Sequence, residues 1–246
     1  MIDLLKKDTT IMKLDHVVYF TNSTPAQIVS EQQKLGQHAV VGGHHEKWGT
    51  QNALMYVSNA YIEWLSVEKE NIAKEAGHSL TNLLLHDLET SEGWGTICIS
   101  IKNIEKFNRE IKKKKFSTSG VFDAERKTPD GQVRKWKMLF IDQPVMDQLP
   151  LPFFIEWEET EEVRFAKLRK DRTFLPANDE LEIKECMFRV KDPLKEISIW
   201  ANLLSQKIND SNRIILPNVL LKFIPSNKNG KERLSDVIIQ PIEKTR

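Results

Sequence analysis

One order of elements, a strand, a helix and then further strands, is predicted twice in this chain, and it restricts the fold more than any other feature. In the first copy, residues 14–20 (LDHVVYF) are rich in β-branched and aromatic residues, which is typical of a strand. Thr24 and Gln27 have the spacing of a helix capping box, with a proline between them at the first helical position. Three strand-like runs follow between residues 38 and 67. The first copy is therefore predicted as a βαβββ unit.

The second copy begins near residue 94. A strand-like run at 95–101 (GTICISI) precedes Asn103, which is predicted to cap a helix. Strand-like runs then follow at 133–141 and 153–159. A helical pattern between the copies, at 71–89, has a break at Gly77-His78. We therefore expect two similar modules joined by helical structure.

A four-residue motif, YIEW in the first copy and FIEW in the second, places Glu63 and Glu156 at the ends of the two modules. Aligning the first strands on their apolar residues places Thr96 opposite His16. Because these polar residues alternate with large apolar ones, we expect them on the sheet face away from the helices. Burying an isolated carboxylate is costly, so two equivalent glutamates favour a shared cavity. The alternative is two amphipathic strands whose carboxylates face water.

The spacing of these patterns divides the chain into five parts. In the last part, Asp192-Pro193 starts a helix between strand-like runs, but no His or Glu occupies the positions singled out above, so we interpret this part as structural. The parts are an N-terminal extension (1–12), a first βαβββ module (13–70), a connecting helix (71–92), a second βαβββ module (93–160), and a linker with a C-terminal βαββ-like extension (161–246).

The composition limits the class of partner. Thirty-six basic and 35 acidic residues leave a formal charge of +1, which argues against a nucleic-acid binder or an anionic-membrane binder. Neither a secretory signal nor an apolar run long enough to span a membrane is present, so we expect a cytoplasmic protein. Cys98 and Cys186 lie in apolar runs and are expected in the core. A small molecule is the expected partner.

Two groups of residues suggest how such a molecule is bound. Trp48, Thr50 and Asn52 would place an aromatic ring beside a hydroxyl and an amide. The alternative is a loop held by threonine and asparagine bonds to the backbone. Arg134 and Trp136 share one face of a strand. If that face is concave, Arg134 binds a carboxylate or oxyanion, and if it is convex, Arg134 pairs on the surface.

Four segments carry a family resemblance: LDHVVYFT, YIEWLSVE, GGHHEKWGTQNAL and LPFFIEWEE. They resemble the glyoxalase-like domain proteins of bacteria, within the vicinal oxygen chelate (glyoxalase/bleomycin resistance/dioxygenase) superfamily, over roughly residues 13–160. The resemblance implies an α+β fold in which paired βαβββ modules form a curled half-barrel sheet with helices outside, followed by a C-terminal βαββ extension. Modules of this kind often pair with another copy, so a homodimer is compatible with the sequence.

The resemblance also implies a metal site. Metal-using members hold a divalent ion through a His on the first strand and a Glu on the last strand of each module. Thr96 takes one of these positions here, and a neutral threonine is a poor ligand. Imidazole and carboxylate together suit iron, manganese, zinc or nickel. The implied ligands are His16, Glu63 and Glu156, with His44 or His45 completing the set.

Two functions follow as expectations. The first is a small-molecule enzyme of vicinal oxygen chelate type, an isomerase, lyase or dioxygenase, in which His16, Glu63 and Glu156 either bind the metal or transfer protons. Glu63 and Glu156 are its candidate catalytic residues. The second is a metal-free protein of the same fold that binds or sequesters a hydrophobic or aromatic molecule, which Thr96 and the many tryptophans favour. Fold alone does not decide between them.

Overall fold

The computed structural model describes residues 12–127, 133–208, 212–226 and 230–242. Residues 1–11 of the predicted extension lie outside this part of the chain, and so does all of 128–131, where the sequence TPDG predicts a turn. Met12, the last residue of the predicted extension, is the first residue of a strand.

The first module has the predicted βαβββ order. Its helix begins as expected, because the Thr24 hydroxyl accepts a hydrogen bond from the Gln27 amide and the Gln27 side chain accepts one from the Thr24 amide. The elements are β1 (Met12–Phe20), α1 (Pro25–Lys34), β2 (Val40–His45), β3 (Thr50–Tyr56) and β4 (Tyr61–Val67).

The connecting segment is a pair of helices, α2 (Glu70–Glu75) and α3 (Ser79–Leu88), separated at the predicted break. The second module repeats the order of the first. Its helix is capped by the Asn103 side chain, as predicted, and its second strand, β6, lies where no strand-like run was assigned within the predicted βαβββ module. The elements are β5 (Gly93–Ile101), α4 (Ile104–Lys113), β6 (Phe122–Lys127), β7 (Val133–Leu139) and β8 (Phe153–Trp157).

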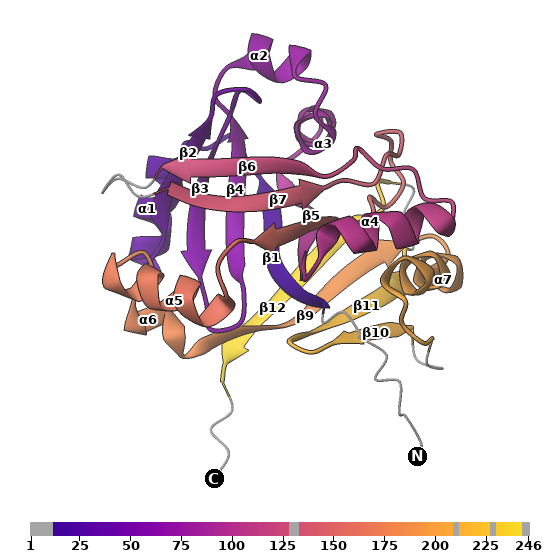
Figure 1. Cartoon of the computed structure of the whole chain (residues 1–246). Coiled ribbons are helices and arrows are strands. Elements are labelled where there is room, and N and C mark those ends of the chain that lie inside the picture. Colours follow the sequence, from indigo (N-terminus) through magenta and orange to yellow (C-terminus); the bar gives the residue numbers. More distant parts are fainter. Residues whose placement is uncertain (1–11, 128–132, 209–211, 227–229, 243–246) are drawn as a thin grey trace, which may run out of the picture.

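The two modules form one eight-stranded sheet in the order β2-β3-β4-β1-β5-β8-β7-β6. They are joined through their first strands, since β1 pairs parallel with β4 on one side and antiparallel with β5 on the other. The sheet curls, so that β6 and β7 pass across the open side of β3 and β4 (Figure 1). The predicted α+β half-barrel is confirmed.

A third unit follows the second module. The predicted linker, which begins at residue 161, starts with a helix whose N-terminus is capped by Thr160. The elements are α5 (Glu161–Lys170), α6 (Pro176–Asp179), β9 (Leu181–Val190), α7 (Pro193–Leu204), β10 (Arg213–Leu216), β11 (Val219–Pro225) and β12 (Arg233–Pro241). The four strands form a second sheet in the order β10-β11-β9-β12.

The third unit repeats half of the pattern of the large sheet. Strand β11 is parallel to β9 and antiparallel to β10, as β4 is parallel to β1 and antiparallel to β3. On its other side, β9 pairs antiparallel with β12, where β1 pairs with β5. Strand β12 therefore takes the place that a partner module has in the large sheet.

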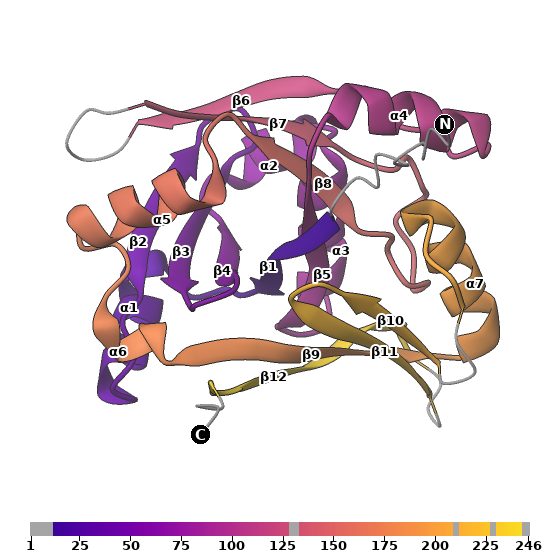
Figure 2. The same cartoon turned by 60° about the horizontal axis from the view of Figure 1, so that its bottom comes forward.

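The second sheet packs behind β1 and β5, on the side away from the curl (Figure 2). One core cluster joins Leu14 and Ile97 of the large sheet to Phe188 and Trp200 of the third unit. Asn218 fixes the contact, because its amide donates to the Leu14 carbonyl at 2.8 Å and its carbonyl oxygen accepts from the Leu14 amide at 2.9 Å. The third unit thus supports the strand that joins the two modules.

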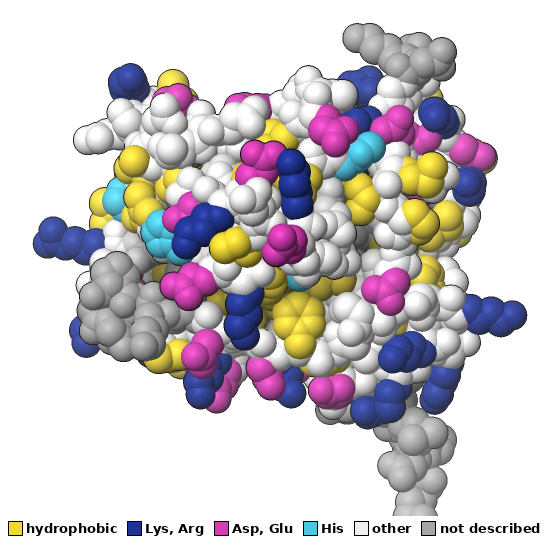
Figure 3. Space-filling model, turned by 90° about the horizontal axis from the view of Figure 1, so that it is seen from above, with side chains coloured by type: hydrophobic (Ala, Val, Ile, Leu, Met, Phe, Trp, Pro, Cys, Tyr) yellow, Lys and Arg dark blue, Asp and Glu magenta, His cyan; other side chains and the backbone are white. Residues whose placement is uncertain are grey.

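Acidic and basic side chains are interspersed over the face seen from above in Figure 3, as the balanced composition leads one to expect. Among the described residues, none of the helices has the length and apolar character that crossing a membrane requires.

Candidate functional site

The concave face of the large sheet lines a cavity of about 710 Å³ that is partly open to solvent. Strands β1, β3 and β4 of the first module form one wall, and β7 and β8 of the second module form the other. His78, which precedes helix α3, and Leu80 and Thr81 of α3 also line the cavity. Both modules therefore shape the same cavity, as the half-barrel fold predicts.

A chain of charged groups lies at the bottom of this cavity. Nδ1 of His16 is 2.9 Å from an Asp15 oxygen, and its Nε2 is 3.4 Å from Glu63 Oε2. Adjacent strand residues normally point to opposite faces. A β-bulge between Leu14 and His16 changes the pairing of β1 with β5, and such a bulge re-aims side chains. Asp15 and His16 can therefore bond to each other although they are neighbours in the strand.

Asp15 is anchored by two further groups. Its second oxygen accepts hydrogen bonds from Trp157 Nε1 at 2.8 Å and from the Arg164 guanidinium at 3.2 Å. The guanidinium also lies 4.4 Å from the centre of the Trp157 ring, a cation–π contact. Burial opposes ionisation of Asp15, but Arg164, His16 and Trp157 outweigh it and lower the pKa of Asp15 to about 2. Asp15 is therefore a carboxylate at neutral pH.

His16 and Glu63 hold opposite charges. Burial favours the neutral ring of His16, but Cys98, Asp15 and Glu63 outweigh burial and raise the pKa of His16 well above its usual range. Burial raises the pKa of Cys98 to about 12, so its thiol is uncharged at neutral pH and the two carboxylates supply the charge. Burial would raise the pKa of Glu63, but His16 outweighs it, so this pKa is lowered. The pair is an imidazolium facing a carboxylate.

Asn52 positions the Glu63 carboxylate. Its side-chain amide donates to Glu63 Oε1 at 2.6 Å, and its carbonyl oxygen accepts from the Gly43 amide at 2.8 Å. A Cβ at Gly42 would lie 2.0 Å from that carbonyl oxygen, so only glycine allows this approach. The paired glycines of the sequence thus make room for the residue that holds Glu63.

Most of the predicted site residues line the cavity. Thr50 and Asn52 lie on β3 rather than in a loop, and the Thr50 hydroxyl is 2.9 Å from His45 Nδ1. Arg134 and Trp136 are on the concave face, where Arg134 forms an ion pair of 2.5 Å with Asp171. The predicted residues in the lining are His16, His45, Trp48, Thr50, Asn52, Glu63, Arg134 and Trp136.

Glu156 and His44 are not part of this cavity. The Glu156 carboxylate accepts hydrogen bonds from the amides of Asn103 and Ile104, at 2.7 and 3.0 Å, and so binds the N-terminus of α4 on the outer face. His44 is exposed and bonds to Glu68. The expectation that Glu63 and Glu156 share a cavity is therefore wrong.

The register of the strands explains this error. His16 is paired with Tyr61 in the first module, and Cys98 with Phe153 in the second. Counting two residues along each last strand places Ile155 at the position of Glu63. The FIEW motif is thus shifted by one residue relative to YIEW, and a one-residue shift moves every side chain to the opposite face. Cys98, not Thr96, lies across from His16.

The metal set implied by the resemblance does not fit these residues. The second module offers Cys98 and Ile155 in place of a His and a Glu, and Glu156 points outward. Donor atoms of Asp15, His16 and Cys98 lie within 4.8 Å of one another, but both Asp15 oxygens already bind His16, Trp157 or Arg164. We therefore derive no step through a metal.

Three residues of the site were not predicted. Asp15 was read only as part of a strand, and Arg164 lay in the segment interpreted as a linker. His78 precedes α3 and stacks on Trp48, with ring centres 4.2 Å apart. Its two ring nitrogens are buried and have no hydrogen-bond partner in the described structure, and burial lowers the pKa of His78 to about 4. A neutral imidazole therefore lies in the cavity wall.

One solved structure shares this fold, and further matches are more distant. A hypothetical protein from Staphylococcus aureus is 25% identical, with a TM-score of 0.75 over 96% of this chain and 93% of that one. A Streptomyces coelicolor methylmalonyl-CoA epimerase in complex with 2-nitronate-propionyl-CoA is 14% identical, with a TM-score of 0.42 over 61% of this chain and 99% of that one. A methylmalonyl-CoA epimerase from Mycobacterium tuberculosis is 16% identical, with a TM-score of 0.41 over 66% and 97%.

Comparison with curated protein sequences gives no match. The family profile described as glyoxalase-like domain, by contrast, matches residues 14–204, which include both βαβββ modules and continue through α7. This chain belongs to the glyoxalase-like domain family, and through it to the vicinal oxygen chelate superfamily.

Proposed function

We propose that the protein is an enzyme that moves a proton on a small molecule, with Glu63 as the general base and His16 as the hydrogen-bond donor to the oxygen on which negative charge develops. The observation that carries this proposal is the chain from Glu63 through His16 to Asp15 at the bottom of the cavity. Asp15 is tied to Arg164 and Trp157, so the chain is held in place from behind.

Glu63 is ionised and partly unpaired, as a general base must be. It is a carboxylate at neutral pH, it is only 7% exposed, and Asn52 occupies one of its oxygens. Its other oxygen is 3.4 Å from His16, too long for a strong hydrogen bond, so it remains available to a proton. When His16 turns its proton to a substrate oxygen, Glu63 loses the main contact that lowers its pKa and becomes a stronger base.

His16 supplies the electrostatic part of the reaction. Asp15 binds Nδ1, which leaves the proton on Nε2 directed toward Glu63 and the cavity. A cationic donor that is fixed in advance stabilises a developing oxyanion. With a carbonyl bonded to His16, Glu63 would take a proton from the adjacent carbon and leave an enolate. For a 2-hydroxy ketone, transfer of the hydroxyl proton to the former carbonyl oxygen and return of the Glu63 proton to the former carbonyl carbon complete an isomerisation. Loss of a leaving group from the β-carbon, which takes the proton that Glu63 holds, completes a lyase reaction.

Hydrogen–deuterium exchange tests this proposal without knowledge of the natural substrate. The protein is incubated in D₂O with a set of 2-hydroxy ketones and 2-oxo acids, and loss of the C–H signal next to the carbonyl is followed by NMR. We expect exchange above the protein-free rate for at least one compound. Exchange that persists unchanged in Glu63→Gln, or that is absent for every compound the protein binds, would contradict the proposal.

The second candidate function is binding without chemistry, and the aromatic lining favours it. Trp48, Trp136 and Trp157 all contact the cavity, and rings of this kind bind flat apolar molecules. Under this function, an aromatic ligand would quench tryptophan fluorescence at micromolar concentration while no C–H exchange occurs. The same D₂O experiment therefore separates the two functions.

A further inference from the structure

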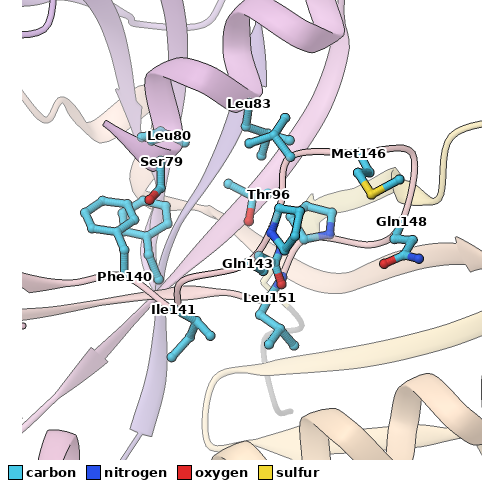
Figure 4. A pocket seen from close by; sticks show the side chains of 14 residues that line it. Ser79, Leu80, Leu83, Thr96, Phe140, Ile141, Gln143, Met146, Gln148 and Leu151 are labelled. Atoms are coloured by element: carbon cyan, nitrogen blue, oxygen red, sulfur yellow. The ribbon is translucent and has the colours of Figure 1, made fainter. Parts of the chain in front are cut away.

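A second hollow of about 460 Å³ lies beside the cavity (Figure 4). Helix α3 borders it with Leu80 and Leu83, and Thr96 of β5 points into it. The segment after β7 closes the other side, with Pro144 and Pro150 among its lining residues.

The hollow borders the proposed active site. Leu80 and Phe153 line both spaces, so that no more than side chains divide them. Phe153 touches His16 edge-on with ring centres 5.4 Å apart, and it stacks on Phe140 at 5.0 Å. A molecule held at His16 therefore lies beside this hollow, with Phe153 between the two spaces.

The outer wall of the hollow is held by a buried ion pair. Arg233 of β12 bonds to both oxygens of Asp87 on α3, at 2.8 and 2.9 Å. The same guanidinium donates to the carbonyls of Met146 and Gln148, at 2.8 and 2.7 Å. Three segments distant in the sequence are thus fixed around one space. A wall held in this way requires little ordering when a ligand binds.

The lining indicates which chemistry fits. The Thr96 hydroxyl is buried, the residue being 3% exposed, and it has no hydrogen-bond partner in the described structure. A buried polar group without a partner is unfavourable, and a bound oxygen or nitrogen atom would satisfy it. The residues that line the hollow are apolar or uncharged, glutamines and Ser79 included. A charged group would be buried there without a counter-charge, which is unfavourable.

We infer that this hollow is the subsite for an uncharged, mainly apolar part of the substrate, and that the Thr96 hydroxyl hydrogen-bonds to an oxygen or nitrogen atom on that part. The substrate class is then a two-part molecule, with a carbonyl-bearing head at His16 and Glu63 and an apolar body beyond Phe153. This inference rests on the proposed function for the position of the head.

Two pairs of probes test the subsite. Hydroxyacetone and 1-hydroxy-4-phenylbutan-2-one share the head and differ in the apolar tail. 1-Hydroxy-4-(4-hydroxyphenyl)butan-2-one adds a hydroxyl to the tail. Calorimetric titration of the full chain gives the Kd of each, and the D₂O assay gives the exchange rate. We expect the tailed ketone to bind at least 10-fold more tightly than hydroxyacetone.

Variants show where the tail lies. Val145→Trp fills the hollow from its loop side and should remove most of the tail's advantage, while hydroxyacetone binding stays within 2-fold. Val163→Trp adds the same ring at a 47% exposed position on α5. It should change neither the tail's advantage nor hydroxyacetone binding. Thr96→Val keeps the side-chain shape and should weaken the hydroxylated tail by 5-fold or more relative to the plain one.

Each contrary result has a definite meaning. Equal affinity for the short and long ketones, or a tail advantage that survives Val145→Trp, overturns the subsite. An unchanged ratio of the two tailed ketones in Thr96→Val overturns the role of the hydroxyl. If the tail-dependent affinity behaves as expected while no ketone exchanges its protons, the proposed function fails and the subsite stands.

Discussion

Glu63 Oε2 lies 3.4 Å from Nε2 of His16, and the two residues come from adjacent parallel strands that are separated in sequence by a helix and two further strands. The pKa of His16 is raised and that of Glu63 is lowered. His16 is the main group that lowers the pKa of Glu63, whereas Asp15 lies closer to His16 than Glu63 does.

Replacing Glu63 by glutamine should abolish the base while keeping the shape of the side chain. We expect the exchange rate to fall by roughly 100-fold or more, the usual contribution of a general base. The measurement is NMR-detected C–H exchange in D₂O with the best compound of the test set. Circular dichroism checks that the fold is retained.

Glu156→Gln is the matched control, because it makes the same change in the repeated motif on the other side of the sheet. It should leave the exchange rate within 2-fold. It should lower stability by about 1 kcal/mol, since the carboxylate binds two backbone amides at the N-terminus of α4. Loss of exchange in this variant would place Glu156 in the chemistry and contradict the site.

The His16 imidazole should remain protonated above pH 7. Its raised pKa means that the folded protein keeps a proton which the unfolded chain loses near pH 6.5. The stabilisation that comes from protonated His16 is fully present below pH 6.5. It is lost as pH rises through the pKa of His16 in the folded protein. NMR titration of the ring gives the pKa directly, and Asp15→Asn should lower it. A ring that titrates near pH 6.5 would rule out the imidazolium.

Asp15→Asn should also destabilise the protein by about 3 kcal/mol, because it leaves the buried Arg164 charge without its carboxylate. Urea denaturation at neutral pH measures this loss. The double variant Asp15→Asn/Arg164→Met removes both charges, so it should be less destabilised than the sum of the two single variants. Additive losses would show that the two residues do not depend on each other.

His78→Phe should change the response to acid. The pKa of His78 is lowered to about 4 by burial, so between pH 6.5 and 4 the unfolded chain binds a proton that the folded chain does not. Wild-type stability should therefore fall by up to about 3 kcal/mol over this range on account of His78. The phenylalanine variant should lose less between the same pH values in urea denaturation. Identical losses of stability in the wild type and the variant would refute this role of His78.

Metal removal should leave the activity unchanged. The ligand set of the two modules is incomplete, since Ile155 and Cys98 stand at two of its four positions. We expect EDTA treatment followed by desalting to change the exchange rate by less than 2-fold. A stoichiometric transition metal in the purified protein that is lost in both His16→Ala and Glu63→Ala would reverse this conclusion and restore the metal-dependent alternative.

The fold was largely predictable because its signals are local. The capping box at Thr24, the Asn103 cap and the break before His78 each act within a few residues, and all are present in the structure. The helix α5 was missed because its charged face resembles a solvated linker. With it, the sequence interpretation also missed Arg164, whose role depends on a contact with Asp15 across the fold.

The site was predictable only for the first module. His16 and Glu63 lie in strands whose alternation reveals their common face. Glu156 has the same neighbours in sequence as Glu63, but the register of β8 against β5 decides its direction, and register follows from the whole sheet. The repeated motif therefore predicted the position of the strand correctly but placed its side chains on the wrong face.

Strand β12 pairs with the edge of β9 that corresponds to the joint between the two modules. That edge is the place where a further module, from this chain or from another copy, would add to the third unit. Because β12 already pairs with this edge, adding another module there requires β12 to be displaced first. Self-association through this edge of β9 would therefore break the β9–β12 ladder.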